Sequence, residues 1–245
     1  MRIKRAADIV LSFALLLAAS PILIISLLLV WAGDFNSPVY FAERIGKDGQ
    51  KFRMFKVRTM VPDADKSSII STGAADSRIT PVGRLIRSFK LDEVLQLTNV
   101  LRGDMSLVGP RPNTWRNGVE LYNETEKRLL NLRPGITDLA SIVFADEAQI
   151  LENVEDPDLA YNQLIRPWKS RLGLVYIDNG SFWLDLRLVF WTVLNTISRR
   201  AALKQVCGCL VKLGVSAELA RICGRDQALT PAPPPGSDQI VTSLS

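Results

Sequence analysis

The chain has 245 residues, which is enough for one medium-sized domain with an anchor or a tail. It contains no histidine, so Ser-His-Asp and Cys-His catalysis and histidine-ligated zinc or iron sites are excluded. The net charge of +5 fits a nucleic acid, anionic phospholipid or a phosphorylated small substrate equally well. The cysteines have no C-x-x-C spacing and are expected to be reduced residues that pack between helices: Cys207, Cys209 and Cys223.

A nearly uncharged apolar run covers residues 9–32, behind a short basic start. It is long enough to cross a bilayer as a helix. A cleaved signal peptide would suit the small residues at 18–20, but Pro21 follows them directly and the apolar sequence continues to Val30. We therefore expect a membrane anchor that stays in the protein.

Two arrangements of this anchor compete, a single transmembrane helix and a re-entrant hairpin. Pro21 lies in the middle of the run and removes a helical hydrogen bond, while the Ser20 hydroxyl can bond the freed carbonyl. We favour a helix-break-helix, broken at Ser20-Pro21, that enters and leaves by the same face. Basic residues on both sides of the run draw both of its ends to the cytoplasm. They are Arg2, Lys4 and Arg5 before it and Arg44, Lys47, Lys51, Arg53, Lys56 and Arg58 after it.

The next segments predict a hairpin and a helix. Residues 38–42 and 51–57 alternate in polarity as strands do, and a glycine-containing turn at 46–49 joins them. Thr80 followed by proline is typical of an N-cap and first helical turn, and it predicts a helix that runs to Ser88.

Helices are predicted along most of the remaining chain, at about 92–101, 115–132, 159–177 and 181–197. Gly103 ends the first of them. The tryptophans of the last helix suit a membrane interface, although packing in the core accounts for them almost as well. Residues 201–224 predict a short extra helix or a hairpin, and the Pro-rich tail after Thr230 predicts disorder.

The acidic pair of Asp92 and Glu93 is the main candidate for chemistry. We expect it in the first turn of a helix, where the helix dipole keeps carboxylates ionised. Neighbouring positions point about 100° apart, so the two could share a divalent cation, or one could attack while the other binds metal or moves protons. Acids at a helix start are ordinarily simple stabilisers. Here, however, cations surround the pair in sequence: Arg84, Arg87, Lys90, Arg102 and Arg111.

Further basic residues are candidates for holding phosphate. Two prolines fix the backbone around Arg111 and could aim its guanidinium at a phosphate, although a surface arginine in a turn is the more common outcome. Lys56 and Arg58 follow a strand, and a solvated strand end explains them equally well. Arg133 fits a plain helix stop as well as a phosphate site. The sequence has no Gly-rich phosphate-binding loop, so side chains and metal would have to hold a nucleotide.

At these residues the chain resembles the bacterial sugar transferase family, the monotopic phosphoglycosyl transferases. The resemblance runs over about residues 2–196. It rests on the basic start, on the Ser-Pro break and on a series of motifs: FKVRTM at 55–60, DSRIT at 76–80, GR at 83–84, LDE at 91–93, QL at 96–97, NVLRGDMSLVGPRP at 99–112 and PGIT at 134–137.

The resemblance implies a ping-pong transfer. An aspartate that matches Asp92 attacks the β-phosphate of a UDP-sugar, expels UMP and carries the phosphosugar, which then passes to a polyprenol phosphate, usually undecaprenyl phosphate. Mg²⁺ is implied at the pair, in which Glu93 matches the second member, and Arg87 and Arg111 match residues that hold phosphate. We add Lys56, Arg58 and Arg133 to the substrate-binding candidates.

The resemblance also places the protein in a pathway and a compartment. It implies an enzyme that starts a surface polysaccharide at the cytoplasmic face of the bacterial inner membrane. The expected partners are membrane phospholipid and the two substrates, without nucleic acid, and a homodimer stays open.

Together these features predict a mostly helical α+β fold. A re-entrant membrane helix-break-helix precedes a compact cytoplasmic domain with a small β-hairpin and interfacial amphipathic helices. We divide the chain into an anchor, a catalytic sugar transferase domain, a helical extension and a disordered tail, at residues 1–35, 36–200, 201–228 and 229–245. The extension and the tail lie outside the resemblance and stay unassigned. The resemblance itself implies a small, catalytic-core version of the family.

The sequence departs from the family pattern at two places. The family usually has proline after Asp-Glu-Leu, whereas this chain continues as Val94-Leu95, and the segment after PGIT at 138–142 differs as well. The second difference bears on sugar choice, so the sugar and the glycan stay open. An inactive, membrane-tethered scaffold is the alternative function, against which the intact acidic pair counts. A membrane phosphohydrolase ranks last because Asp-x-Asp surroundings are missing.

Overall fold

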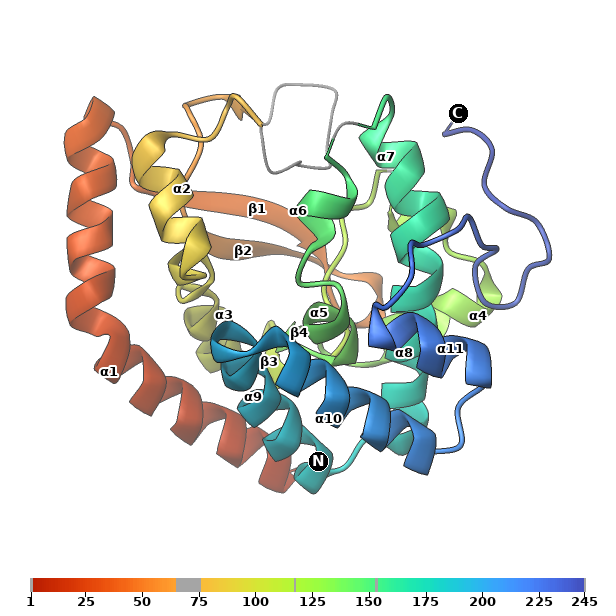
Figure 1. Cartoon of the computed structure of the whole chain (residues 1–245). Helices are drawn as coiled ribbons and strands as arrows, with labels where there is room; N and C mark the ends of the chain where they lie inside the picture. The colour runs from red at the N-terminus through yellow and green to blue at the C-terminus, as the bar shows by residue number, and fades with distance from the viewer. Residues whose placement is uncertain (1, 65–75, 117, 153, 245) are drawn as a thin grey trace.

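A computed structural model describes residues 2–64, 76–116, 118–152 and 154–244. A long N-terminal helix lies along one side of a mostly helical body that also contains a small β-hairpin (Figure 1). The predicted α+β class is therefore confirmed. The FKVRTM motif at 55–60 and the DSRIT motif at 76–80 lie within the described residues, and residues 65–75 between them lie outside.

The N-terminal helix α1 spans Arg2–Asp34 and contains Pro21. It consists of two halves that meet at a bend (Figure 1), and a proline is the usual cause of such a bend. Pro21 has no N–H for the carbonyl of Leu17, and the Ser20 hydroxyl donates to that carbonyl at 2.7 Å. The predicted role of Ser20 is confirmed, but the expected break is a bend inside one continuous helix.

Most of α1 is exposed and apolar. The stretch Ile3–Asp34 is long and apolar enough to cross a membrane, and 17% of its most apolar window is buried in the protein. Exposed apolar surface of this extent indicates contact with lipid or another protein. Length and composition fit a span and a re-entrant hairpin equally well.

The N-terminal turns of α1 are attached to the folded domain by three charged side chains. Lys4 forms an ion pair with Asp185 at 2.6 Å, and Arg5 donates to the carbonyl oxygen of Val100 at 2.7 Å. Asp8 is buried and accepts a hydrogen bond from the Ser106 hydroxyl at 2.8 Å. Lys4 and Arg5, two of the basic residues before the apolar run, therefore bind groups of the protein itself.

The C-terminal end of α1 is attached to the same domain. Asp34 receives two hydrogen bonds from the guanidinium of Arg58, at 2.7 and 2.6 Å. The apolar residues Leu23 and Val30 pack with Val57 and Ile86 in a small core cluster. Both ends of the helix thus contact one domain.

The hairpin formed by β1 (Val39–Ile45) and β2 (Lys51–Val57) follows α1, and its turn contains the 3₁₀ helix η1 (Lys47–Gly49). The strands are antiparallel with Val39 opposite Val57, which confirms the predicted hairpin. The buried Asn99 side chain accepts from the Phe55 amide at 2.9 Å and donates to the Arg53 carbonyl at 2.7 Å. It therefore ties the hairpin to the helix that follows the acidic pair.

Helix α2 (Pro81–Ser88) begins as predicted. The Thr80 hydroxyl caps it by accepting from the amide of Gly83 at 2.9 Å. A Cβ on Gly83 would lie 2.0 Å from the Thr59 carbonyl oxygen, so only glycine allows this approach of α2 to the hairpin.

The helix predicted at 92–101 begins later than expected. The chain turns at Lys90, which has a positive φ of 57°, and then forms the short 3₁₀ helix η3 (Leu91–Glu93). Helix α3 (Gln96–Arg102) follows, and Gly103 ends it with a φ of 98°. Asp92 and Glu93 therefore lie in a 3₁₀ turn and not in the first turn of an α-helix, which corrects the helix-dipole argument.

The prediction of one long helix at 115–132 is wrong. The described part of this segment contains η4 (Val119–Leu121), α4 (Glu124–Lys127) and η5 (Arg128–Asn131). Asn123 starts a new helix because it forms a capping box with Glu126. The carboxylate of Glu126 is fully buried and forms an ion pair with Arg166, which fixes the segment at this position.

The remaining elements form the main core. Strand β3 (Ser106–Val108) pairs in parallel with β4 (Gly135–Thr137). The helices that follow are α5 (Leu139–Val143), α6 (Glu147–Ile150), α7 (Pro157–Ala160), η6 (Tyr161–Ile165), α8 (Arg166–Asn179), α9 (Phe182–Ile197), α10 (Arg199–Lys212) and α11 (Ala217–Gly224).

Several predictions for this half hold. Residues 157–179 are helical throughout the run α7–η6–α8 despite Pro167, with one π-helical turn in η6, and α9 matches the predicted helix. Residues 201–224 belong to the two helices α10 and α11 and the short loop between them, without a β-strand. Helices α5, α8, α9 and α10 contribute to the largest buried cluster. Ala232 of the tail is also buried there and donates to the Gln163 carbonyl at 3.0 Å, while the four-part division of the chain stays a prediction.

Candidate active site

The acidic pair lies in the turn η3, between α2 and α3. Glu93 is held in an ion pair by Arg111, whose guanidinium donates from both terminal nitrogens to its carboxylate. Asp92 has no hydrogen-bond or ion-pair partner among the residues that the structure describes. The two neighbouring carboxylates are therefore not equivalent, since one is fixed and the other is available.

The surroundings shift the pKa values of the two carboxyls in opposite directions. Burial raises the pKa of Asp92, and the negative charge of Glu93 raises it further, against the lowering effect of Lys56, Arg87 and Arg111. Burial also acts to raise the pKa of Glu93, but Arg111 and Lys56 outweigh it and hold this pKa well below its usual range. Asp92 is thus the more basic carboxylate, and Glu93 stays ionised.

Three cations converge on the pair from separate elements. Lys56 comes from β2 and Arg87 from α2, where its Nε donates to the Thr59 hydroxyl at 2.8 Å. Burial lowers the pKa of both side chains, while Glu93 raises the pKa of Arg111. Cations in a partly desolvated site attract phosphate more strongly than cations in water.

Two cavities adjoin at Asp92. One has a volume of about 330 Å³ and the other of about 370 Å³. We call them the hairpin cavity, which extends past Thr59 and Met60, and the α8 cavity, which extends to Lys169. Five of the described residues line both: Arg44, Lys56, Arg87, Asp92 and Thr114. Asp92 can therefore be reached from two sides.

The structure brings Lys56, Arg87 and Arg111 together around the acidic pair but not the other two phosphate candidates. Arg58 lines the hairpin cavity, yet its guanidinium is bound by Asp34. Arg133 donates to the Gly103 carbonyl at 2.8 Å and lines neither cavity.

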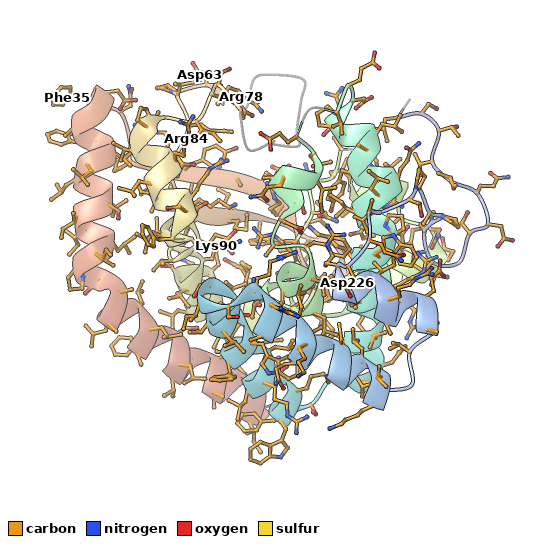
Figure 2. The ribbon with its side chains drawn as sticks, viewed as in Figure 1. Phe35, Asp63, Arg78, Arg84, Lys90 and Asp226 are labelled. Atoms are coloured by element: carbon orange, nitrogen blue, oxygen red, sulfur yellow. The ribbon has the colours of Figure 1, made fainter. Side chains whose placement is uncertain are left out.

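The other cations near the pair in sequence also separate. Lys90 lines the α8 cavity, whereas Arg84 lies on the exposed side of α2 (Figure 2). Arg102 instead stacks on the Phe55 ring, 4.5 Å from its centroid. Sequence proximity to the acidic pair therefore did not decide which cations reach it.

Sequence reasoning missed several residues of the cavities. Arg44 of β1 lines both, and Glu147, Tyr161 and Lys169 line the α8 cavity. Arg44 lies two residues beyond the strand predicted at 38–42, and the sequence singled it out only as one of the basic residues that follow the anchor. The other three are ordinary helical residues in sequence, and only the tertiary fold brings them to the site.

The pair offers two carboxylates to a metal ion. The described residues contain no group of three or more histidine, cysteine, aspartate or glutamate side chains that could hold one. Mg²⁺ commonly binds to one or two carboxylates and completes its shell with water and substrate phosphate. Asp92 and Glu93 fit that pattern, so the donor set is compatible with a Mg²⁺ ion that is shared with a phosphorylated substrate.

Two substitutions should move the pKa of Asp92 in opposite directions. Lys56→Met removes a positive charge that lowers this pKa, so the pKa should rise. Glu93→Gln removes the negative charge that raises it, so the pKa should fall. Titration of the Asp92 carboxyl carbon by ¹³C NMR, with the signal assigned by its loss in Asp92→Asn, measures both effects. Shifts in the same direction would contradict this arrangement of charges.

Comparisons with known proteins agree with the sequence motifs. The model of the bacterial sugar transferase family matches residues 1–199. An undecaprenyl-phosphate glucose phosphotransferase of Komagataeibacter xylinus is 37% identical over 206 residues, which cover 81% of this chain and 36% of that protein. A UDP-glucose:undecaprenyl-phosphate glucose-1-phosphate transferase of Klebsiella pneumoniae is 32% identical over 205 residues, 82% of this chain and 42% of that protein.

A relative of similar length matches as well. The exopolysaccharide production protein PSS of Rhizobium leguminosarum bv. phaseoli is 35% identical over 208 residues, which cover 80% of this chain and 96% of that protein. The chain thus spans less than half the length of the first two relatives and almost all of the third. The family match over residues 1–199 and these identities establish that the chain belongs to the bacterial sugar transferase family.

Proposed function

We propose that this chain transfers a sugar 1-phosphate from a UDP-sugar to undecaprenyl phosphate through a covalent intermediate on Asp92, with release of UMP. The observation that carries this proposal is the asymmetry of the acidic pair. Asp92 is unpaired, has a raised pKa and lines two cavities, whereas Arg111 holds Glu93 in place. A basic, unpaired carboxylate beside cations is suited to attack phosphorus.

In the first step, an oxygen of the Asp92 carboxylate attacks the β-phosphorus of the UDP-sugar. The bond between this phosphorus and the bridging oxygen breaks, and UMP leaves with the electron pair. Lys56, Arg87 and Arg111 neutralise the charge that develops on the phosphoryl oxygens. The Asp92 side chain then carries the sugar phosphate as an acyl phosphate.

In the second step, a phosphate oxygen of undecaprenyl phosphate attacks the same phosphorus, and the Asp92 carboxylate leaves. In-line displacement places each incoming or outgoing group opposite Asp92, so UMP and the lipid phosphate use the same side in turn. We assign this exchange to the hairpin cavity, and the α8 cavity then holds the sugar through both steps. Two cavities that share Asp92 support this division.

We assign Mg²⁺ to the acidic pair. Bound there, it would neutralise charge on the diphosphate and favour departure of UMP. Glu93 would hold the ion with an oxygen that stays ionised, because its pKa lies well below the usual range. Arg111 fixes the orientation of Glu93 through the ion pair.

We further propose that the protein is monotopic in the bacterial inner membrane, with its domain on the cytoplasmic face. Contacts of both ends of α1 with one domain support a helix that returns to the side from which it entered. Helix α9 adds a stripe of exposed apolar residues that recur every three or four positions, which suits the membrane interface. They are Phe182, Leu186, Phe190, Val193 and Ile197.

The names of the relatives leave several sugars open. Three are named for glucose, one is named a galactosyl transferase, and one is named for N-acetylgalactosamine. Other relatives are named exopolysaccharide production proteins. We therefore propose an initiating role in a surface polysaccharide, with UDP-glucose as the first donor to test.

The test is release of UMP. Purified protein with Mg²⁺ and a panel of UDP-sugars should release UMP, with continuous turnover when undecaprenyl phosphate is added. Asp92→Asn should abolish both turnover and the phosphosugar adduct seen by intact mass spectrometry. Because Asp92 must be ionised to attack, the rate should fall as pH drops through its raised pKa, at higher pH than for an ordinary aspartate.

Two results would contradict the proposal. Normal turnover by Asp92→Asn would remove the nucleophile assignment. No UMP from any sugar, under conditions in which the Klebsiella relative is active, would favour the inactive scaffold.

A further inference from the structure

The α8 cavity has a part with a chemistry different from the cation-rich region at Asp92. Glu147 of α6, Tyr161 of η6 and Lys169 of α8 line it together. Lys169 forms an ion pair with Glu147, and its ammonium lies 5.4 Å from the centroid of the Tyr161 ring. We call these three residues the α8 wall.

The charges of the α8 wall cancel. Around Asp92, the cations Lys56, Arg87 and Arg111 exceed the two carboxylates, which suits a diphosphate. In the α8 wall, the ammonium of Lys169 is matched by the carboxylate of Glu147, so no excess positive charge is left for a phosphate. The wall offers a hydrogen-bond donor, an acceptor and an aromatic surface that carries a hydroxyl.

The α8 wall lies within reach of a group attached to a phosphate at Arg111. The charge of Glu147 contributes, after that of Glu93, to the raised pKa of Arg111, so both carboxylates lie near this guanidinium. One cavity of about 370 Å³ contains Asp92, Arg111 and the wall. A phosphate beside Arg111 and a sugar against the wall fit the same cavity.

We propose that the α8 wall is the subsite that recognises the hydroxyl groups of the donor sugar, and that it takes a neutral pyranose in preference to a uronic acid. This inference rests on the proposed transferase function. A carboxylate, an ammonium and a phenol can pair with sugar hydroxyls, and a ring face can pack on the sugar's C–H groups. Because Glu147 matches the charge of Lys169, the wall has no excess positive charge to attract a sugar carboxylate.

Deoxy sugars test this subsite. The series of monodeoxy analogues is made on whichever UDP-sugar is the best donor, and kcat/KM is measured from UMP release. A site that hydrogen-bonds a hydroxyl discriminates strongly against the analogue that lacks it. For wild-type protein, kcat/KM should therefore be at least tenfold lower with one or more analogues than with the parent sugar. In Glu147→Gln or Tyr161→Phe, the same analogue should lower kcat/KM less than threefold.

The matched control is Glu124→Gln, which breaks the exposed ion pair with Lys127 outside both cavities. It should leave the ratio of kcat/KM between the parent sugar and each deoxy analogue, which we call the deoxy penalty, unchanged. Glu147→Gln should also improve the rate with the corresponding UDP-uronic acid relative to the neutral sugar. Unchanged deoxy penalties in both Glu147→Gln and Tyr161→Phe would overturn the subsite, while absence of UMP release by wild-type protein would overturn the transferase function itself.

A separate set of contacts connects the C-terminal helices to this cavity. Arg225, just after α11, forms an ion pair with Asp146 at 3.1 Å, and its guanidinium lies 5.5 Å from the centroid of the Phe144 ring. Arg199, at the start of α10, pairs with Asp146 at 2.8 Å and donates to the Val143 carbonyl at 3.1 Å.

The segment held by these arginines lines the α8 cavity. Phe144, Ala145 and Glu147 all line it, on either side of Asp146. Arg225 and most of α10 lie beyond residues 1–199, which the family model matches. We infer that Arg225 is a positioning residue. Through it, a segment outside the family match holds the segment 144–147, which lines the α8 cavity.

Kinetics of UMP release test this role. Arg225→Gln should raise KM for the UDP-sugar at least fivefold and change kcat less than twofold. It loosens the segment 144–147, which lines the α8 cavity, and leaves Asp92 intact. Arg225→Lys keeps the charge and should hold KM within twofold of wild type. Asp146→Asn should repeat the effect of Arg225→Gln from the other partner.

The matched control is Arg128→Gln, which removes the exposed ion pair with Asp178 away from both cavities. It should leave KM unchanged. A KM within twofold of wild type in both Arg225→Gln and Asp146→Asn would overturn the positioning role. So would a loss of thermal stability and kcat together without a change in KM.

Discussion

The attachment of both ends of α1 to one domain is the constraint on which the rest of this structure depends. A straight helix of 33 residues would be about 50 Å long, more than the thickness of a bilayer's hydrocarbon core. The bend at Pro21 lets its C-terminal half return to the domain, where Asp34 meets Arg58. Arg5 meets the last turn of α3, at the negative end of that helix's dipole. These contacts are polar and specific, so they differ from the apolar contact a membrane alone would supply.

The same contacts connect the anchor to the chemistry. Arg58 follows β2 directly, and two residues earlier in the chain Lys56 lines both cavities beside Asp92. Arg5 donates to a carbonyl of α3, the helix that follows the acidic turn, and the buried Asn99 of α3 accepts from β2. Two short series of contacts therefore connect α1 with the elements beside Asp92. Under the proposed function, these contacts are a physical reason why the depth of the anchor would set the distance between Asp92 and a lipid phosphate.

Local rules predicted the parts of the fold that local groups stabilise. The Thr80 cap, the end of α3 at Gly103, the hairpin and the bond from Ser20 to the carbonyl of Leu17 depend on neighbours within a few residues. The turn at the acidic pair was missed because Lys90 takes a positive φ, which its sequence does not favour. The segment after Trp115 was predicted as one helix because its capping box at Asn123 was overlooked.

The cavity residues also fall into those that local sequence identifies and those that only tertiary contacts bring to the site. Asp92, Glu93 and Arg111 were identified from local sequence, as an acidic pair with nearby cations and an arginine between two prolines, and the same residues match a family motif. Whether a cation reaches the pair depends on tertiary partners, as Arg58 and Arg133 illustrate with Asp34 and Gly103. Glu147 and Lys169 lie 22 residues apart in sequence, and only the tertiary fold brings their side chains into contact. No local pattern distinguishes such residues from ordinary helical surface.

Site-specific cysteine labelling in intact cells tests the central claim most directly. Single cysteines are placed by Ile3→Cys, Asn36→Cys and Gln205→Cys in a chain whose three native cysteines are replaced by alanine, and each is probed with a membrane-impermeant maleimide before and after lysis. Our account predicts that all three positions are protected in intact cells and labelled together after lysis. Labelling of position 3 and position 36 from opposite sides of the membrane would mean that α1 spans it, and would contradict the account.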